Sequence, residues 1–132
     1  MNEYLKQATD FLAKANAKMQ ITLLGAEQNK RWNEKDFRNT YRVTIATPKG
    51  SMWVKFWDSI HNKKHGIKPN EYDILSCLQK YDVGTYEDFL SEFGYDPEDK
   101  HSKEIYKACV SEYERLCRIF TDDQMEELRE IY

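Results

Sequence analysis

Tyr41-Arg-Val-Thr-Ile-Ala-Thr-Pro-Lys-Gly-Ser-Met-Trp-Val-Lys-Phe-Trp57 is the stretch of sequence that decides the fold. Two runs rich in β-branched and aromatic residues flank the turn-forming Pro48-Lys49-Gly50, which predicts a β-hairpin. Apolar and polar side chains alternate within each run, so one face of the hairpin is aliphatic and the other carries Trp53 and Trp57 among cations. The apolar segment Gln20–Gly25 is the candidate for a third strand.

A helix and two connections surround these strands. Apolar residues recur at three- and four-residue steps from residue 3 to residue 19, which predicts an amphipathic helix over that range. The polar segment Ala26–Asn39 is predicted to be a long loop between the first two strands, and loops of this length are often functional. The segment Asp58–Lys68 is basic and contains Gly66, so we expect an irregular joint between the sheet and the second half of the chain.

The second half of the chain is predicted to be helical, because turn and capping residues divide it into short amphipathic segments. Two capping-box patterns mark helix starts, since a threonine is followed three residues later by a carboxylate or an amide. The predicted helices run from Pro69 to the residue before Gly84, from Thr85 to Gly94, from Asp96-Pro97 to Phe120, and from Thr121 to about Ile131.

The expected fold class is therefore α+β, with an N-terminal helix, a three-stranded antiparallel sheet and a C-terminal bundle of three to four helices. At 132 residues the chain has the size of one domain, so residues 1–132 are expected to share one core. No apolar run approaches the ~20 residues of a membrane span, and the polar start lacks signal-peptide features, so we expect a cytosolic protein. The residues expected in the core include Phe11, Ile45, Val54, Phe56, Leu75, Leu116 and Phe120.

The charges of the chain separate at about residue 68. Residues 1–68 carry 13 Lys/Arg and 6 Asp/Glu, a formal charge of +7, whereas residues 69–132 carry 7 Lys/Arg and 17 Asp/Glu, a formal charge of −10. Such a separation creates a strong field around a protein, and this field governs the attraction of partners rather than the choice of fold. The sequence therefore says more about partners than about catalysis.

No catalytic or metal-binding constellation is recognisable in the sequence. His61 and His65 have the spacing of two zinc ligands on one helical turn, but Gly66 and the neighbouring lysines argue against a helix and against a cation site. The three cysteines have no CxxC pair and no neighbouring His to lower a thiol pKa, and no glycine-rich phosphate loop occurs. We therefore expect a non-enzymatic protein without a metal or a cofactor.

Cations interleaved with aromatic rings form the first candidate contact surface. Lys and Arg neutralise phosphates and aromatic rings stack on bases, which is how many proteins bind nucleic acid. The alternative is that the tryptophans belong to the core and that the cations pair with the acidic half of the chain. The residues of this basic set are Lys30, Arg31, Trp32, Lys35, Arg38, Arg42, Trp53, Lys55 and Trp57.

Carboxylates gathered within thirteen residues form the second candidate surface. A dense anionic surface on a rigid scaffold can occupy the basic groove in which a nuclease holds nucleic acid, and so act as a nucleic acid mimic. The alternative is an ordinary solvated face. The residues of this acidic set are Glu87, Asp88, Glu92, Asp96, Glu98 and Asp99.

Five short stretches resemble a group of small proteins encoded by phages and prophages of Gram-positive bacteria. They are Phe56-Trp-Asp-Ser-Ile-His-Asn62, Lys68-Pro-Asn-Glu-Tyr-Asp-Ile-Leu-Ser-Cys-Leu78, Tyr86-Glu-Asp-Phe89, Glu92-Phe-Gly-Tyr-Asp96 and Leu128-Arg-Glu-Ile131, and the similarity covers about residues 20–131. Short accessory proteins in phage genomes often act against host defence, with anti-CRISPR proteins as the best-known case. The resemblance therefore implies inhibition by stoichiometric binding, and it supplies no catalytic residues.

The predicted function is that of a phage-encoded anti-defence protein that inhibits a host nuclease complex by binding it. The expected partner is a host defence protein, with a Cas nuclease or its guide complex as the first choice. Two alternatives stay open from the sequence. One is a nucleic-acid-binding accessory protein of phage replication or recombination, and the other is a binder of the nucleotide signals used in defence.

Overall fold

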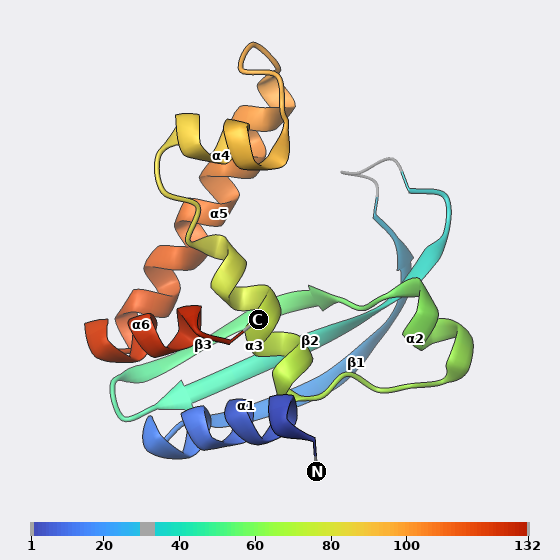
Figure 1. The fold of residues 1–132 in the computed structure, drawn as a ribbon. Coiled ribbons are helices and arrows are strands. Elements are labelled where there is room, and N and C mark those ends of the chain that lie inside the picture. Colours follow the sequence, from blue (N-terminus) through green and yellow to red (C-terminus); the bar gives the residue numbers. More distant parts are fainter. Residues whose placement is uncertain (1, 30–33, 132) are drawn as a thin grey trace.

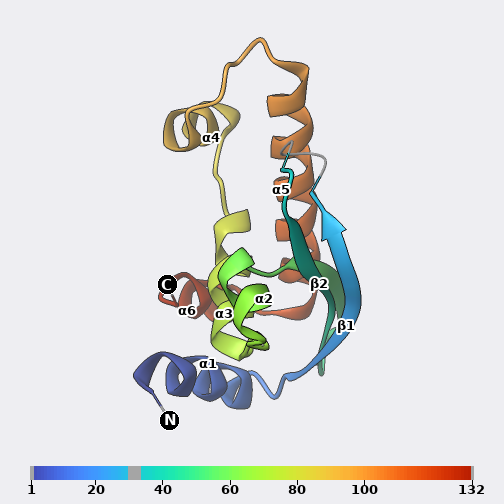
Figure 2. The same ribbon diagram turned by 90° about the vertical axis from the view of Figure 1, so that its right-hand side faces the viewer.

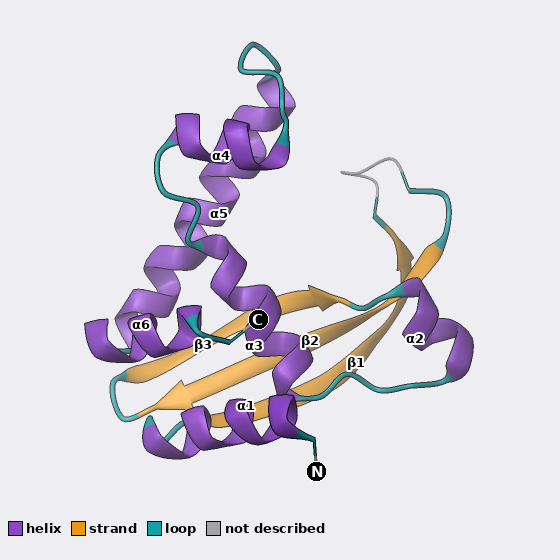
Figure 3. Ribbon diagram, viewed as in Figure 1, coloured by secondary structure: helices purple, strands orange, loops and turns teal. Residues whose placement is uncertain are grey.

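The computed structural model describes residues 2–29 and 34–131, and Figure 1 shows its α+β architecture. An N-terminal helix, a three-stranded antiparallel sheet and a series of helices follow one another, as the sequence predicts. Five α-helices come after the sheet in the described residues, which is more than the three to four predicted (Figure 3). The elements in chain order are α1 (Glu3–Lys14), β1 (Lys18–Gln28), β2 (Phe37–Thr47), β3 (Gly50–Trp57), α2 (Ile60–His65), α3 (Glu71–Leu78), the 3-10 helix η2 (Gln79–Tyr81), α4 (Tyr86–Phe93), α5 (Lys100–Ile119) and α6 (Asp122–Arg129).

The hairpin predicted from residues 41–57 is confirmed as the antiparallel pair of β2 and β3. Val43 of β2 lies opposite Ile21 of β1 on one side and opposite Val54 of β3 on the other. Residues directly opposite each other share a face, so the apolar residues of the three strands form one surface. The strand order is β1-β2-β3, which makes β1 and β3 the edges of the sheet.

The polar segment Ala26–Asn39, predicted to be a loop, is strand at both ends, over residues 26–28 and 37–39, and the loop prediction is wrong there. Both β1 and β2 extend into it, and Glu27 of β1 pairs with Arg38 of β2. The ladder uses backbone groups that every non-proline residue carries, so long-range pairing overrides the polar composition of this segment.

The first helix is shorter than predicted, because it ends at Lys14 rather than near residue 19. Asn16 adopts a left-handed backbone conformation (φ +51°), which Asn tolerates better than most residues. The Ala17 N–H then donates to the Leu12 carbonyl at 2.8 Å and closes the helix end. Met19, predicted on the helix stripe, therefore lies in β1.

The main core lies between the apolar face of the sheet, the helices α1, α3 and α6, which Figure 2 shows on the same side of the sheet, and the C-terminal end of α5. Leu75 and Leu116 are fully buried there, and the ring of Phe11 lies 5.4 Å from that of Phe120, centroid to centroid. Six of the seven predicted core residues are buried, and Phe56 is only partly so. Figure 2 also shows that the opposite face of the sheet is uncovered.

The joint Asp58–Lys68, predicted to be irregular, contains the short helix α2. Ser59 caps this helix by accepting a hydrogen bond from a backbone N–H at 3.0 Å, and Gly66 ends it in a left-handed conformation (φ +65°). His61 and His65 therefore do share a helical turn, with ring centroids 4.4 Å apart, contrary to the prediction. The described residues contain no group of three or more His, Cys, Asp or Glu side chains that could hold a metal ion.

Capping boxes begin α4 and α6 where the sequence predicts them. In each, the threonine hydroxyl accepts from the backbone of the third helical residue, whose side chain accepts from the threonine N–H. The helix α5 begins later than predicted, because Asp99 rather than Asp96 accepts the capping hydrogen bond, from the His101 N–H at 2.9 Å. Asn70 caps α3, which places Pro69 before that helix rather than in its first turn.

A small lobe, which we call the distal lobe and define as residues 83–106, stands beyond the sheet (Figure 1). Its buried cluster is separate from the main core and consists of Val83, Phe89 and Ile105. The 20-residue helix α5 runs from this lobe to the β3 edge of the sheet and so joins the two regions. Neither α5 nor any other helix of the described residues is long and apolar enough to cross a membrane.

Candidate binding surfaces

The ion pairs of the protein stay within the two halves of the chain. Five pairs occur among the described residues, and in each both partners come from residues 1–68 or both from residues 69–132. Cations of the basic half therefore do not form ion pairs with the acidic half in the described part of the chain, which contradicts that part of the alternative interpretation of the basic set. The pairs are Lys6–Asp10, Arg38–Glu34, Lys55–Glu27, Arg115–Glu112 and Arg129–Asp82.

An aromatic cluster supports the distal lobe. Phe89 is its centre and is 1% exposed. The rings of Tyr86, Phe93, Tyr95 and Tyr106 surround it with centroid distances of 6.4, 5.2, 5.3 and 5.5 Å. Ring pairs at such distances add attraction to the burial of their apolar area, so the lobe has a small, well-defined core.

Two hydrogen bonds fix the loops of the distal lobe to this cluster. The Tyr86 hydroxyl donates to the Pro97 carbonyl at 3.1 Å, and the Tyr106 hydroxyl donates to the Gly84 carbonyl at 2.9 Å. Gly84 has a left-handed conformation (φ +70°), and a Cβ there would lie 3.0 Å from Asp88 Oδ2. The entry to α4 therefore favours glycine, chiefly for its left-handed conformation and also because a Cβ would contact Asp88 closely.

All six residues of the predicted acidic set are exposed and lie together in the distal lobe. Residues 86–99 contain no Lys or Arg, and none of the six belongs to an ion pair among the described residues. Three of these side chains accept backbone hydrogen bonds at helix or turn starts, whereas the other three accept none from the described residues. The first three are Asp88, Asp96 and Asp99, and the other three are Glu87, Glu92 and Glu98.

Phe93 is a contact candidate that the sequence reasoning missed. Its side chain is 45% exposed at the end of α4, beside the acidic set, although its ring also contacts that of Phe89. It lies four residues after Phe89 and so on the same helix face, where a sequence pattern predicts a core residue. Only the structure distinguishes the two.

The structure divides the predicted basic set. Three of its members, Lys30, Arg31 and Trp32, lie outside the described residues. Lys35 is exposed, whereas Arg38 is held by Glu34 at 2.6 Å and donates to the Asp58 carbonyl at 3.1 Å. The charge of Arg38 is therefore balanced within its own segment.

Lys55 is also paired. Its Nζ lies 2.8 Å from Glu27 Oε1, and the Thr40 hydroxyl donates to Glu27 Oε2 at 2.8 Å. These hydrogen bonds, that from Lys55 first, lower the pKa of the Glu27 carboxyl. The Lys55 ammonium also lies over the Trp57 ring, 4.9 Å from its centroid, so the two residues form one cation–aromatic pair on the uncovered face.

Arg42 and Trp53 form a second cation–aromatic pair on the same face. The Arg42 guanidinium carbon lies 4.6 Å from the centroid of the Trp53 ring, and Trp53 is 45% exposed. No carboxylate of the described residues pairs with Arg42. This pair is therefore both accessible and positively charged.

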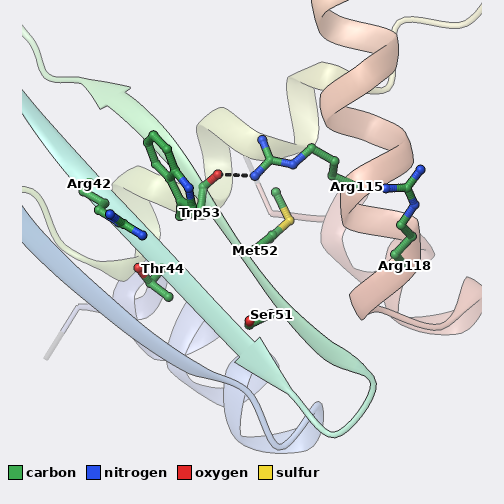
Figure 4. Close-up of a pocket in the computed structure, with 7 residues that line it drawn as sticks. All are labelled: Arg42, Thr44, Ser51, Met52, Trp53, Arg115 and Arg118. Atoms are coloured by element: carbon green, nitrogen blue, oxygen red, sulfur yellow. Dashed lines mark hydrogen bonds between the residues drawn. The ribbon is translucent and has the colours of Figure 1, made fainter.

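A cavity of about 270 Å³ opens beside Arg42 and Trp53, between β3 and α5 (Figure 4). Two arginines of the acidic half reach it. Arg115 donates to the Trp53 carbonyl and is held by Glu112 at 2.8 Å, whereas Arg118 is exposed and has no carboxylate partner among the described residues. The lining residues are Arg42, Thr44, Ser51, Met52, Trp53, Arg115 and Arg118.

A second cavity, of about 1000 Å³, shares Trp53 and Arg115 with the first and extends along β3 and α5. Cys77 and Tyr81 lie in its wall, and burial raises the pKa of both side chains. Because burial disfavours the charged form, the Cys77 thiol stays protonated at neutral pH. This cavity therefore does not present Cys77 as a thiolate nucleophile.

No protein-family model, curated protein or solved structure matches this chain. Two surfaces of the described residues are the candidates for binding: the acidic surface of the distal lobe and the arginine-lined cavity between β3 and α5.

Proposed function

We propose that this chain is a phage-encoded, non-enzymatic anti-defence protein that inhibits a host nuclease complex through its distal lobe. The target we propose is a Cas nuclease or its guide complex, in keeping with the resemblance to phage accessory proteins. The observation that carries the proposal is the acidic set itself, whose six carboxylates are exposed and outside every ion pair of the described residues. Channels that hold nucleic acid are basic, so an anionic surface fits them in place of phosphates.

The packing of the distal lobe favours this use. Phe89 and the rings around it hold α4 against α5, and the Tyr86 hydroxyl holds the connecting loop through the Pro97 carbonyl. Charges on an ordered surface lose less conformational entropy on binding than charges on a flexible tail. Phe93 adds an exposed aromatic ring beside the carboxylates, and such rings are common energetic anchors of protein interfaces.

The triple variant Glu87→Gln, Glu92→Gln, Glu98→Gln tests the proposal. It removes the three carboxylates that cap nothing and keeps the capping Asp88 and Asp99, so the fold should persist. The matched control is Glu126→Gln, Glu127→Gln, Glu130→Gln, which makes the same charge change on exposed positions at the end of the chain.

The measurement is inhibition of target-DNA cleavage by a purified Cas complex, together with the association rate of the two proteins at several salt concentrations. We expect the distal-lobe triple variant to lose inhibition, mainly through slower association with a weaker salt dependence, while the control inhibits as the unmodified protein does. Full inhibition by a folded distal-lobe variant would contradict the proposal. Loss of inhibition in the control alone would move the contact to the α6 region.

A second candidate function is nucleic-acid binding by an accessory protein of phage replication or recombination. The observation that favours it is the pair of cation–aromatic contacts, Arg42 with Trp53 and Lys55 with Trp57, on the uncovered face of the sheet. Binding of this kind must weaken steeply with salt, because each neutralised phosphate releases condensed counterions. Absence of any complex with single-stranded or duplex DNA and RNA at ~50 mM salt, where such contacts are strong, would remove this candidate.

A further inference from the structure

We infer that the cavity between β3 and α5 binds one nucleotide unit, with its phosphate among the arginines and its base against Trp53. This inference rests on the second candidate function, whose ligand chemistry and residues it specifies, and it does not depend on the distal lobe. The nucleotide is either free or part of a single strand, and the two sources share the same chemistry.

Three arginines from two elements line this cavity (Figure 4). Arg42 comes from β2, and Arg115 and Arg118 come from α5. Only Arg115 has a carboxylate partner among the described residues, so the cavity keeps an excess of positive charge. A guanidinium presents its N–H donors in a planar fork that matches phosphate oxygens, which makes arginine the preferred side chain for this anion.

One arginine of the cavity is held by other residues of the protein, and another is left available for a ligand. Arg115 is fixed in place because it donates both to Glu112 and to the Trp53 carbonyl. Arg118 is exposed and has no such partner among the described residues, so it is available for a ligand. Thr44 and Ser51 also line the cavity, and a hydroxyl can donate a hydrogen bond to a phosphate oxygen.

Trp53 distinguishes a nucleotide from a bare anion. Trp53 is 45% exposed, and the Arg42 guanidinium lies over one face of its ring with the guanidinium carbon 4.6 Å from the ring centroid, so a base would stack on the other face or on the outer side of the guanidinium. Bases stack on indole rings and on guanidinium planes, whereas a sulfate or phosphate ion gains nothing from stacking. An exposed tryptophan beside unpaired arginines therefore favours a ligand that has both a phosphate and a base.

The size and the continuation of the cavity agree with a single nucleotide that can belong to a strand. Its volume of about 270 Å³ lies just below the ~300–1000 Å³ of pockets for drug-sized ligands. Trp57 with Lys55 lies further along the same strand, and Trp57 is about 13 Å from Trp53 at ~3.3 Å per residue. A strand seated on Trp53 would therefore meet a second cation–aromatic pair.

The test uses the full chain with three probes, which are adenosine monophosphate, inorganic phosphate and a short oligothymidylate. Affinities are measured by calorimetry for the first two and by fluorescence anisotropy for the labelled strand, at ~50 mM salt, where phosphate contacts are strong. The main variant is Arg118→Gln, and the matched control is Lys103→Gln, which removes one positive charge from an exposed position on the same helix outside the cavity.

We expect Arg118→Gln to weaken binding of the monophosphate or of the strand by about tenfold, as for the loss of one charge-assisted hydrogen-bonded contact. We expect Lys103→Gln to change either affinity by less than about twofold, because a distant exposed charge is largely screened. Binding of the monophosphate indicates a free nucleotide as the ligand, and binding of the strand alone indicates a single-stranded nucleic acid.

A second variant, Trp53→Leu, tests the base. It should weaken the nucleotide probes and leave inorganic phosphate unchanged. No binding of any probe, equal effects of Arg118→Gln and Lys103→Gln, or phosphate affinity equal to that of the monophosphate would each overturn the inference. Both folded variants, Arg118→Gln and Trp53→Leu, should still inhibit the nuclease complex. Nucleotide binding therefore tests the cavity alone, and inhibition tests the distal lobe alone.

Discussion

The main core and the distal lobe differ in how many buried residues form them. Eighteen buried residues from the sheet and its helices form the main core, whereas three form the buried cluster of the distal lobe. The exposed carboxylates gather on the smaller of the two. The comparison teaches that the largest part of the folding free energy lies away from the acidic surface, so binding and global stability can change independently.

The largest expected effect is in the main core. Leu75→Ala should lower the free energy of unfolding by about 2–5 kcal/mol, because Leu75 is fully buried and its truncation leaves a cavity. Urea denaturation followed by circular dichroism measures this loss. The control Leu23→Ala, at a residue that is 58% exposed on β1, should change little. Similar losses in both variants would show that the main core is not where we place it.

Phe89→Ala should act locally instead. It removes the centre of the aromatic cluster, so α4 should detach from α5 while the sheet keeps its own contacts. Hydrogen exchange should show lost protection in residues 86–93 and unchanged protection in β2. The loss of global stability should be smaller than for Leu75→Ala, because it cannot exceed what the packing of the distal lobe contributes. A variant in which β2 exchanges equally fast would show that the two regions fold as one unit.

The two threonine caps offer a matched pair of smaller changes. Thr121→Ala and Thr85→Ala each remove a hydroxyl that accepts a backbone hydrogen bond at a helix start, which is worth about 0.5–2 kcal/mol. Thr121 caps α6 of the main core, so its loss should lower the global unfolding free energy. Thr85 caps α4, so its loss should raise hydrogen exchange in the distal lobe alone. A change confined to the distal lobe in Thr121→Ala, or a loss of global stability in Thr85→Ala, would contradict this difference between the two regions.

The smallest expected effect depends on pH. Because Lys55 and Thr40 lower the pKa of Glu27, its carboxylate stabilises the fold above the ordinary value of about 4.3, and this contribution disappears as the pH falls through the lowered pKa. Glu27→Gln should therefore lower the melting temperature slightly at pH 7, and the difference should fade on acidification below pH ~4. Thermal melts at several pH values measure it. A difference that grows on acidification would contradict this sign.

Local chemistry explains which parts of the fold could be predicted. The hairpin at Pro48-Lys49-Gly50 and the capping boxes at Thr85 and Thr121 are set by neighbouring residues, and the structure confirms all three. The prediction of the first helix extends too far, because Asn16 ends the helix in a left-handed backbone conformation that the neighbouring residues do not predict. The strand pairing of Glu27 with Arg38 was not predicted, because the ladder uses backbone groups and the polar side chains of this segment give no strand pattern.

The two candidate surfaces also differ in how far the sequence predicts them. The acidic set is contiguous in sequence, so its assembly on the distal lobe follows from the sequence alone. The cavity between β3 and α5 is not contiguous, because it joins Arg42 and Trp53 to two arginines more than sixty residues later. Arg115 and Arg118 lie in the half of the chain whose formal net charge is −10, so the charge distribution does not indicate a basic site there. Only the path of α5 along β3 brings them to Trp53.

The helix α5 also sets a fixed distance. Its cap, Asp99, belongs to the acidic surface, and Arg118 near its other end belongs to the cavity, so at ~1.5 Å per residue the two lie roughly 28 Å apart along one rod. A single molecule that contacts both ends of α5 must therefore present a cationic group to the acidic surface and an anionic group to the cavity at this separation. Four inserted residues would lengthen this distance by ~6 Å and rotate one end of the helix by ~40° relative to the other, so the spacing of the two surfaces and the directions in which they face would change together.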